Sequence, residues 1–334
     1  MFKRIRRIAL STAIVGLTWA GAAQANELKE LNFGIISTES SQNLKEQWEP
    51  FLAAMSEKTG MEIKAFFAPD YAGIIQGMRF DKVDVAWYGN KSAMEAVDRA
   101  GGEVFMQTVA ADGKPGYWSL LIAHKDSPLT SVEDMLKNAK ELTFGNGDPN
   151  STSGFLVPSY YVFAQNNVEP KEIFKRTLNA SHEVNALSVA NKQVDVATFN
   201  TEGFERLEIT NPEKAKELKV IWKSPLIPSD PIVWRKNLPD ATKTKIHAFF
   251  SEFGANEQEM AVLEGLQWGK FRVSSDDQLL PIRQLELFKT RSQVAADSTL
   301  SDSEKKAKLA SIDADLEKLA QRLAALEKKV ASAQ

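Results

Sequence analysis

Three consecutive hydroxyl residues, Ser151, Thr152 and Ser153, are the residues of this chain best suited to binding an anion. They follow an apolar stretch that ends near Gly145, where a helix is expected to begin. Backbone N–H groups in the first turn of a helix have no intrahelical partner, and the helix dipole makes that end positive. Together with hydroxyl donors they form an anion site that needs no Lys or Arg. The alternative is that Asn150 or Ser151 only caps the helix.

A tyrosine and a histidine are expected to reach the same site from two different parts of the chain. Tyr71 and His182 are 111 positions apart, and each follows a predicted strand and begins a predicted helix. Either side chain can form a hydrogen bond with an anionic oxygen. Taken alone, Tyr71 also fits a packed surface aromatic and His182 a helix cap, but their shared offset favours a common cleft.

Two acidic residues and one aromatic residue could bind a positively charged group. Glu202 follows a repeated strand motif, Asp230 lies between two prolines, and Tyr117 lies at an expected connection between lobes. Two carboxylates and an aromatic ring can bind an ammonium group by ion pairing and cation–π contact. The alternatives are an acid favoured by the helix dipole for Glu202 and a turn residue for Asp230.

An internal repeat supplies the elements that must position these side chains. The sequence Val-Asp-Val-Ala occurs at 83–86 and again at 194–197, and an asparagine follows each copy, Asn90 or Asn200. The same offset of 111 residues relates Leu-Asn-Phe-Gly at 31–34 to Leu-Thr-Phe-Gly at 142–145. Two matches at one offset indicate two similar α/β lobes, and a cleft between lobes commonly binds a small ligand.

The hydrophobic pattern predicts strands that alternate with helices in both lobes. In the first lobe the predicted strands are 31–36, 61–67 and 83–87, and the predicted helices are 44–55, 71–78 and 91–97. In the second lobe the predicted strands are 142–145, 173–178 and 194–198, and the predicted helices are 151–165, kinked at Pro158, and 182–191. This alternation implies parallel strands, and ligands of such sheets bind beyond the carboxyl ends of the strands, where helices begin.

Two short β-prone segments, 117–123 and 220–227, are expected to be paired hinge strands that cross between the lobes. Helical patterns at 241–253, 257–265 and 276–288 then return the chain to the first lobe. The predicted organisation is a first lobe of residues 26–118 and 226–295, a second lobe of residues 119–225, and a C-terminal helix over 296–334.

The C-terminal helix has an apolar seam in which steps of three and four residues alternate. Its members are Leu309, Ile312, Leu316, Leu319, Leu323, Leu326 and Val330. This is the heptad pattern of a coiled coil. The seam is interpreted either as the underside of a terminal helix that lies across the body or as a contact with a second copy of the chain.

Residues 1–25 have the pattern of a signal peptide. Four basic residues precede an apolar run at 8–20, and Ala23-Gln24-Ala25 fits a small-residue cleavage site. The run is shorter than the roughly 20 residues that a membrane-spanning helix needs, although an uncleaved anchor is the alternative. We therefore expect cleavage after Ala25 and an exported protein.

Composition and motifs exclude several classes of function. Without residues 1–25 the chain has 37 Lys and Arg against 44 Asp and Glu, a net charge of −7, which does not favour nucleic acid or an anionic membrane. There is no Cys and there are only three His, so thiolate chemistry is excluded and no His-Glu-x-x-His metal motif occurs. A Ser151–His182–Asp230 triad is the enzymatic alternative, and a sensor domain is another, but no catalysis, cofactor or metal is expected.

Four segments resemble the periplasmic phosphonate-binding proteins of phosphonate ABC importers. They are LNFGIISTES at 31–40, FFAPDYAG at 66–73, FGNGDPNSTSG at 144–154 and WKSPLIP at 222–228. The resemblance implies a type II periplasmic binding fold, a periplasmic location, a ligand such as 2-aminoethylphosphonate, and ABC permease subunits in the inner membrane as partners. A homodimer through the C-terminal helix is less safely implied, because the tail diverges more.

The resemblance also implies roles for individual residues. Four residues would hold the phosphonate oxygens: Tyr71, Ser151, Thr152 and Ser153. His182 would belong to the pocket, and Glu202, Asp230 and Tyr117 would surround the ligand amine. A binding protein for phosphite, phosphate or an organosulfonate is the alternative, and the chemistry beside the two acids would decide between them.

Overall fold

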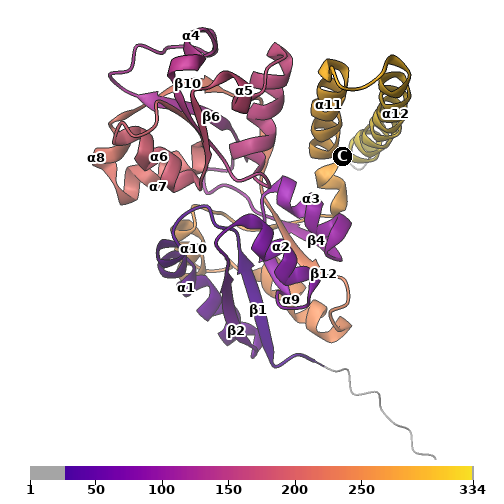
Figure 1. Cartoon of the computed structure of the whole chain (residues 1–334). Coiled ribbons are helices and arrows are strands. Elements are labelled where there is room, and N and C mark those ends of the chain that lie inside the picture. Colours follow the sequence, from indigo (N-terminus) through magenta and orange to yellow (C-terminus); the bar gives the residue numbers. More distant parts are fainter. Residues whose placement is uncertain (1–26, 333–334) are drawn as a thin grey trace, which may run out of the picture.

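The computed structural model describes residues 27–332, so the predicted signal peptide at 1–25 lies outside the described residues. Two α/β lobes are built around separate sheets, and a helical hairpin follows at the C-terminal end (Figure 1). This confirms the predicted α/β class and the two lobes. No helix between residues 27 and 332 combines the length and the apolar character needed to cross a membrane.

The sheet of the first lobe has six strands in the order β13-β4-β12-β3-β1-β2. Strand β1 (Glu30–Ile35) lies between β2 (Glu62–Phe67) and β3 (Val85–Trp87) and is parallel to both, as predicted. Three further strands are antiparallel to their neighbours: β4 (Gly102–Gln107), β12 (Pro231–Arg235) and β13 (Arg272–Val273). The helices of this lobe are α1 (Ser41–Thr59), α2 (Tyr71–Arg79), α3 (Asn90–Arg99), α9 (Asp240–Glu252) and α10 (Glu257–Gly265).

The sheet of the second lobe has five strands in the order β10-β6-β9-β7-β8. Strand β7 (Thr143–Asn146) is parallel to both β8 (Arg176–Asn179) and β9 (Val196–Asn200). Strands β6 (Ser119–His124) and β10 (Leu218–Lys223) are antiparallel to each other, and β6 is antiparallel to β9. The helices are α4 (Val132–Asn138), η1 (Ala139–Glu141), α5 (Pro170–Ile173), α6 (His182–Ala190), α7 (Thr201–Thr210) and α8 (Pro212–Ala215).

The repeated Val-Asp-Val-Ala motif has the same structural role in both lobes. Asp84 Oδ2 accepts a hydrogen bond from Asn32 N (2.8 Å), and Asp195 Oδ2 accepts one from Thr143 N (2.7 Å). The amides of the two aspartates donate back to the carbonyls of the same partners, at 2.9 and 3.1 Å. Each aspartate therefore ties its own strand to the neighbouring central strand in the same way, so the two motifs have one structural role.

The helical segment after β7 differs from the α-helix predicted at 151–165. It contains π-helical turns η2 (Thr152–Leu156) and η3 (Ser159–Phe163), followed by a 3₁₀ turn, η4 (Ala164–Asn166). Pro158 has no N–H to give to the preceding turns, and the carbonyls of Ser153 and Gly154 accept hydrogen bonds from Ser119 Oγ (2.6 Å) and Gly147 N (2.9 Å). The segment is thus tied to the sheet at its first turn, and π-turns of this kind occur frequently at functional sites.

The passage between the lobes is shorter than the two hinge strands predicted at 117–123 and 220–227. Only β5 (Gly116–Tyr117) and β11 (Ile227–Pro228) form the separate two-stranded sheet there. Most residues of the two predicted segments belong to β6 and β10 of the second sheet instead. All side chains of β6 are buried in the second lobe, so this strand is part of the lobe's core and not a connection. The prediction that the two segments pair is confirmed, and their assignment as hinge strands is wrong for the longer part of each.

The C-terminal helix predicted over 296–334 is present, and it forms a hairpin with the helix that precedes it. Helix α11 (Leu280–Ala296) follows η5 (Asp276–Leu279), and α12 (Asp302–Ser332) then runs back beside α11 (Figure 1). Ser301 and Glu304 cap α12 reciprocally: Ser301 N donates to Glu304 Oε2 (2.9 Å) and Glu304 N to Ser301 Oγ (3.4 Å).

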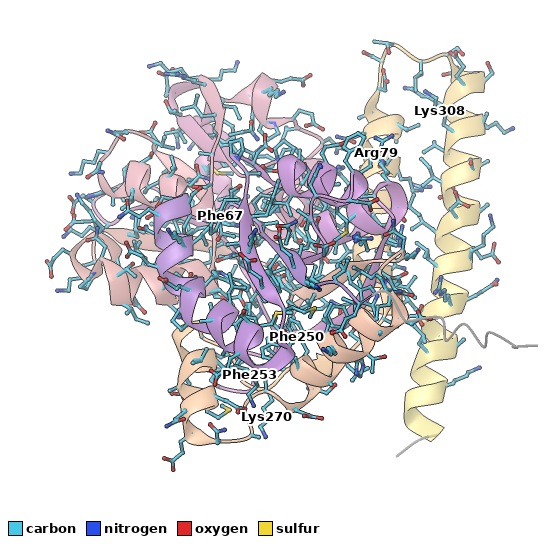
Figure 2. All side chains as sticks on the ribbon, turned by 90° about the horizontal axis from the view of Figure 1, so that it is seen from below. Phe67, Arg79, Phe250, Phe253, Lys270 and Lys308 are labelled. Atoms are coloured by element: carbon cyan, nitrogen blue, oxygen red, sulfur yellow. The ribbon has the colours of Figure 1, made fainter. Side chains whose placement is uncertain are left out.

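Helix α12 is attached to its neighbour by ion pairs and by its apolar seam. Arg291 Nε of α11 lies 2.6 Å from Asp313 Oδ1, and Arg322 pairs with Asp277. The seam side chains whose placement is described are half-buried: Leu309, Ile312, Leu316, Leu319, Leu323 and Leu326. The tail therefore packs on α11 and does not lie across the body of the lobes (Figure 1). Figure 2 shows the same from below, with the helix that carries Lys308 at the edge of the molecule.

Candidate ligand-binding site

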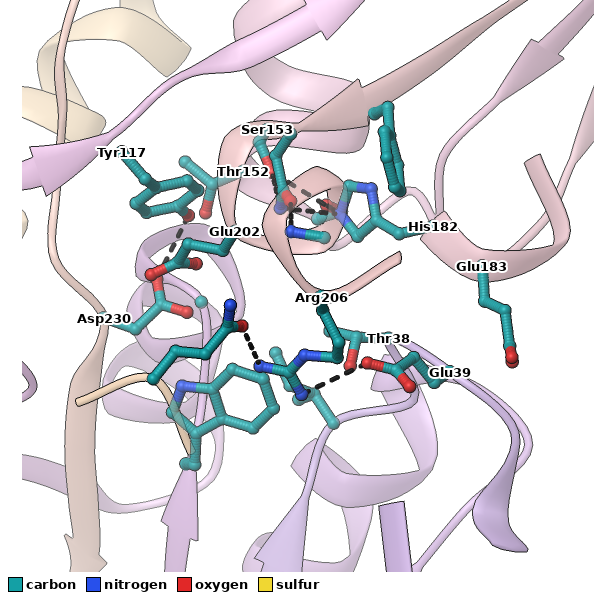
Figure 3. Close-up of a pocket in the computed structure, with 18 of the residues that line it drawn as sticks. Thr38, Glu39, Tyr117, Thr152, Ser153, His182, Glu183, Glu202, Arg206 and Asp230 are labelled. Atoms are coloured by element: carbon teal, nitrogen blue, oxygen red, sulfur yellow. Dashed lines mark hydrogen bonds and ion pairs between the residues drawn. The ribbon is translucent and has the colours of Figure 1, made fainter. Parts of the chain in front are cut away.

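One cavity between the lobes is lined by every residue predicted to bind the ligand. These are Tyr71, Tyr117, Ser151, Thr152, Ser153, His182, Glu202 and Asp230, all of which except Tyr71 and Ser151 are labelled in Figure 3. Its volume of about 60 Å³ is room for several water molecules or one small polar ligand. Most of the residues come from helix starts, since α2 begins at Tyr71, η2 at Thr152, α6 at His182 and α7 at Thr201.

The three hydroxyl groups are oriented as donors. Each oxygen already accepts a hydrogen bond from a protein N–H group: Ser151 from Gly154 N (2.9 Å), Thr152 from Lys91 N (2.8 Å) and Ser153 from Asn200 Nδ2 (3.0 Å). All three side chains are at least 98 % buried. Ser151 is thus the helix cap, as the alternative interpretation had it, but capping uses its oxygen as an acceptor and leaves its proton available.

His182 lies beside the hydroxyl groups as a neutral side chain. Its Nε2 is 3.4 Å from the Oγ atoms of both Ser151 and Ser153. Burial lowers the pKa of His182 to about 4, so the ring is uncharged at neutral pH. Its Nδ1 is buried and has no hydrogen-bond partner among the described residues. A neutral imidazole can donate one hydrogen bond to an anion without contributing charge.

Tyr71 is buried at the start of α2, where Asp70 caps the helix by accepting from Gly73 N (2.8 Å). The Tyr71 amide crosses the cleft and donates to Asp148 Oδ2 (3.1 Å). Burial, and then the negative charge of Asp148, raise the pKa of the Tyr71 phenol. The phenol therefore keeps its proton and remains a donor.

Two carboxylates lie at the other end of the cavity, of which Asp230 is buried and Glu202 is half-buried. Tyr117 Oη donates to Asp230 Oδ1 (3.1 Å), and Figure 3 shows Glu202 beside this pair. Burial raises the pKa of Glu202 to about 7, while Arg206 opposes the shift. Burial and the charge of Glu202 raise the pKa of Asp230 well above its usual range. Two acids that are costly to ionise in this place would be stabilised as carboxylates by a cationic ligand group.

No described residue places a cationic side chain at the anion-binding end. Among the described residues that line the cavity, Arg206 is the only Lys or Arg. Its guanidinium contacts Glu39 (3.2 Å) and Gln267 (3.1 Å), one helical turn after Glu202. The electrostatic design is therefore polarised, with neutral donors at one end and acids at the other.

Two residues of the site were not singled out by the sequence. Asn200 caps α7 by accepting from Gly203 N (2.7 Å), and its amide nitrogen holds Ser153 (3.0 Å). Gly89, 111 positions earlier, begins α3, and a Cβ there would lie 3.3 Å from Thr152 Oγ1. Asn200 stood at the end of the repeated motif, so the repeat itself could have pointed to both positions.

Comparison with known proteins identifies relatives over nearly the whole chain. A family model described as "ABC transporter, phosphonate, periplasmic substrate-binding protein" matches residues 33–279. The phosphonates-binding periplasmic protein of Escherichia coli K12 is 63 % identical over 318 residues, which cover 95 % of this chain and 94 % of that protein.

Solved structures agree with this comparison. The binding protein component of an ABC phosphonate transporter from Pseudomonas aeruginosa superposes with a TM-score of 0.89 at 71 % identity, covering 90 % of this chain and all of that one. A Prochlorococcus marinus protein solved in complex with methylphosphonate is 21 % identical, with a TM-score of 0.68 over 77 % of this chain and 97 % of its own. The latter likeness shows the shared fold.

Proposed function

Because this chain belongs to the family of periplasmic substrate-binding proteins of phosphonate ABC transporters, we propose that it prefers aminated phosphonates, with 2-aminoethylphosphonate as the favoured ligand. The chain is the substrate-binding component of a phosphonate importer and has the type II periplasmic binding fold. This family serves transport and is not a family of enzymes, so the geometry of the cavity has to explain binding rather than catalysis.

The phosphonate group would bind where the neutral donors converge. The hydroxyl protons of Ser151, Thr152 and Ser153, the Tyr71 phenol and one His182 N–H are available around the start of the helical segment at 152. A hydrogen bond to a charged group contributes about 1.5–3 kcal/mol. Five such bonds contribute about 7.5–15 kcal/mol, which spans the roughly 8–12 kcal/mol of micromolar to nanomolar binding, and lobe closure and lost ligand freedom offset part of it.

The ligand amine would bind between Glu202 and Asp230, with the Tyr117 ring and hydroxyl beside it. The observation that carries this assignment is the pair of acids, Asp230 buried and Glu202 half-buried, between which none of the described residues places a cation. An ammonium group would allow both to ionise in a place where burial otherwise disfavours it. A ligand without an amine leaves both acids desolvated and unpaired, which costs on the order of 2–5 kcal/mol.

Binding would act through closure of the lobes. The ligand contacts residues of both lobes, so it stabilises the closed form by its greater affinity for that form. The closed form is then the one that the permease subunits receive. Contacts that already cross the cleft, such as Lys91 N to Thr152 Oγ1 (2.8 Å), support this picture.

Calorimetry of the mature chain with four ligands tests the proposal. We expect 2-aminoethylphosphonate to bind most tightly, and methylphosphonate, phosphate and taurine to bind at least about tenfold more weakly. Glu202→Gln should weaken only the aminated phosphonate. Equal affinity for phosphate, or tighter binding of phosphite or taurine, would instead support the alternative ligands and contradict the role given to Glu202 and Asp230.

Two further proposals concern the exported protein as a whole. We propose that export removes residues 1–25 with cleavage after Ala25, which mass spectrometry of the periplasmic protein would test. We also propose that two copies associate through α12, because its seam is only half-buried in one chain. Two hairpins packed together would cover the remaining apolar surface.

A further inference from the structure

The 111-residue offset maps the anion-binding helix start of the second lobe onto the start of α1 in the first. Ser151 corresponds to Ser40, and both are helix caps. Ser151 Oγ accepts from Gly154 N (2.9 Å), and Ser40 Oγ accepts from Asn43 N (3.2 Å). Each lobe thus directs one equivalent helix start, with its free N–H groups, toward the cleft.

The helix start of the first lobe is occupied by a carboxylate of the protein itself. Glu183 Oε2 accepts from Ser40 N (2.8 Å), and Glu183 Oε1 accepts from Asn43 Nδ2 (2.6 Å). The Glu183 amide also donates to Thr38 O (3.2 Å). Glu183 belongs to α6 of the second lobe and directly follows His182, so these bonds all cross the cleft. In Figure 3 it lies beyond His182, at the opposite side of the site from Glu202 and Asp230.

We propose that Glu183 is an affinity-determining residue that acts as an interlobe latch, defined by its bonds to Ser40 and Asn43. The latch forms only when the lobes are closed, because its partners lie in different lobes. It therefore stabilises the closed, ligand-bound form without contacting the ligand. The inference rests on the proposed function only in that closure accompanies phosphonate binding.

The charges around the latch explain why an acid is suited to this position. A carboxylate at a helix start is stabilised by the dipole and by charge-assisted bonds to N–H groups. Glu39 is a competing charge near the latch: burial raises its pKa, and the Glu183 charge adds to the shift. Arg206 of the second lobe lies 3.2 Å from Glu39 across the cleft, and its positive charge offsets the repulsion between Glu39 and Glu183. Two sets of contacts thus cross the cleft here, the latch itself and the Arg206–Glu39 ion pair.

A double-mutant cycle tests the latch in the mature chain. Glu183→Gln replaces one accepting oxygen by a donor that faces other donors, and Asn43→Ala removes one partner. We expect each single variant to weaken binding of 2-aminoethylphosphonate and methylphosphonate by the same factor, about three- to tenfold, through a faster dissociation rate. The double variant should be little weaker than Glu183→Gln alone, because both changes remove one interaction.

The control is Glu208→Gln, an exposed acid of α7 that makes no hydrogen bond or ion pair with other described residues, and it should leave both affinities unchanged. A fully additive cycle, or unchanged dissociation in Glu183→Gln, overturns the latch. So does weakening confined to the aminated ligand, because Glu183 would then contact the amine. If the unmodified protein shows no preference for 2-aminoethylphosphonate over methylphosphonate, the proposed ligand is refuted. An equal weakening of both ligands by Glu183→Gln would still support the latch.

Discussion

At the scale of single residues, the site is defined by groups whose hydrogen-bonding roles are already fixed. The oxygens of Ser151, Thr152 and Ser153 each accept from the protein, and Tyr71 is held protonated by burial. A site made of such committed donors needs little reorganisation when an anion arrives.

Replacing Thr152 by valine tests the donor role with little change in shape. Thr152→Val removes the hydroxyl proton and the cross-cleft bond from Lys91 N. We expect binding of methylphosphonate and 2-aminoethylphosphonate to weaken by the same factor, about 10- to 100-fold. Calorimetry would measure it, with Thr244→Val on the exposed face of α9 as the matched control. A loss restricted to one ligand would place Thr152 away from the phosphonate.

The acid pair predicts a pH dependence. Burial raises the pKa of Glu202 to about 7, above its usual 4.5, so the folded ligand-free protein binds more protons than the unfolded chain between these pH values. Its stability should therefore fall as pH rises through this window. Affinity for an aminated phosphonate should rise over the same window, because the ammonium group needs the ionised acid.

Two measurements check this prediction. The melting temperature of the ligand-free protein between pH 5 and 8 should decrease with pH, and less so in Glu202→Gln. Calorimetry in buffers of different ionisation enthalpy should show proton release when 2-aminoethylphosphonate binds at about pH 6.5. Proton uptake on binding would contradict the assignment of the amine to Glu202 and Asp230.

At the scale of elements, the cavity depends on how closely helix starts of opposite lobes approach. Gly89 begins α3 directly against Thr152, and a methyl group there would lie 3.3 Å from Thr152 Oγ1. Gly89→Ala should hinder closure and weaken all phosphonates about threefold to thirtyfold, with the ligand-free melting temperature nearly unchanged. Gly265→Ala, whose added methyl group meets nothing within 4 Å, is the control and should leave affinity unchanged.

The sequence was informative about elements wherever one periodicity decided the structure. The buried face of α1, with Trp48, Phe51, Leu52 and Met55, follows directly from helical spacing. The π-helical turns after β7 could not be predicted, because they depend on Ser119 and Gly147 binding the carbonyls that Pro158 leaves free. The antiparallel strands β4 and β12 were also missed, since local pattern does not specify strand partners.

The site was more accessible to prediction than the contacts that surround it. Residues with functional chemistry at helix starts, such as Tyr71 and His182, were found by type and offset, and all eight candidates line one cavity. Three further residues were not found: Gly89, Asn200 and Glu183. A glycine before a helix, a capping asparagine and an acid in the first turn of a helix are each explained by local structure alone. Their importance comes from the opposite lobe, which only the folded chain brings near. Ligand contact by the eight residues stays a prediction.

At the scale of the whole molecule, the α11–α12 hairpin predicts the oligomeric state. Light scattering should give the mass of two chains for the mature protein and of one chain for Leu316→Glu, which puts a charge into the half-buried seam. Glu317→Gln, on the exposed face of α12, should leave the mass unchanged. Affinity for phosphonates should be the same in all three, because the cavity is complete within one chain. A single-chain mass for the unmodified protein would refute the dimer.

The polarised cavity has a consequence for how fast the protein loads in different environments. The anion-binding end relies on dipoles, whose attraction decays within a few ångströms. The chain without residues 1–25 also has more acidic than basic residues. Salt therefore has no long-range attraction between the protein and an anionic ligand to screen, and it only weakens a small repulsion between them. The rate at which a phosphonate associates with the protein should therefore change little as the ionic strength is raised.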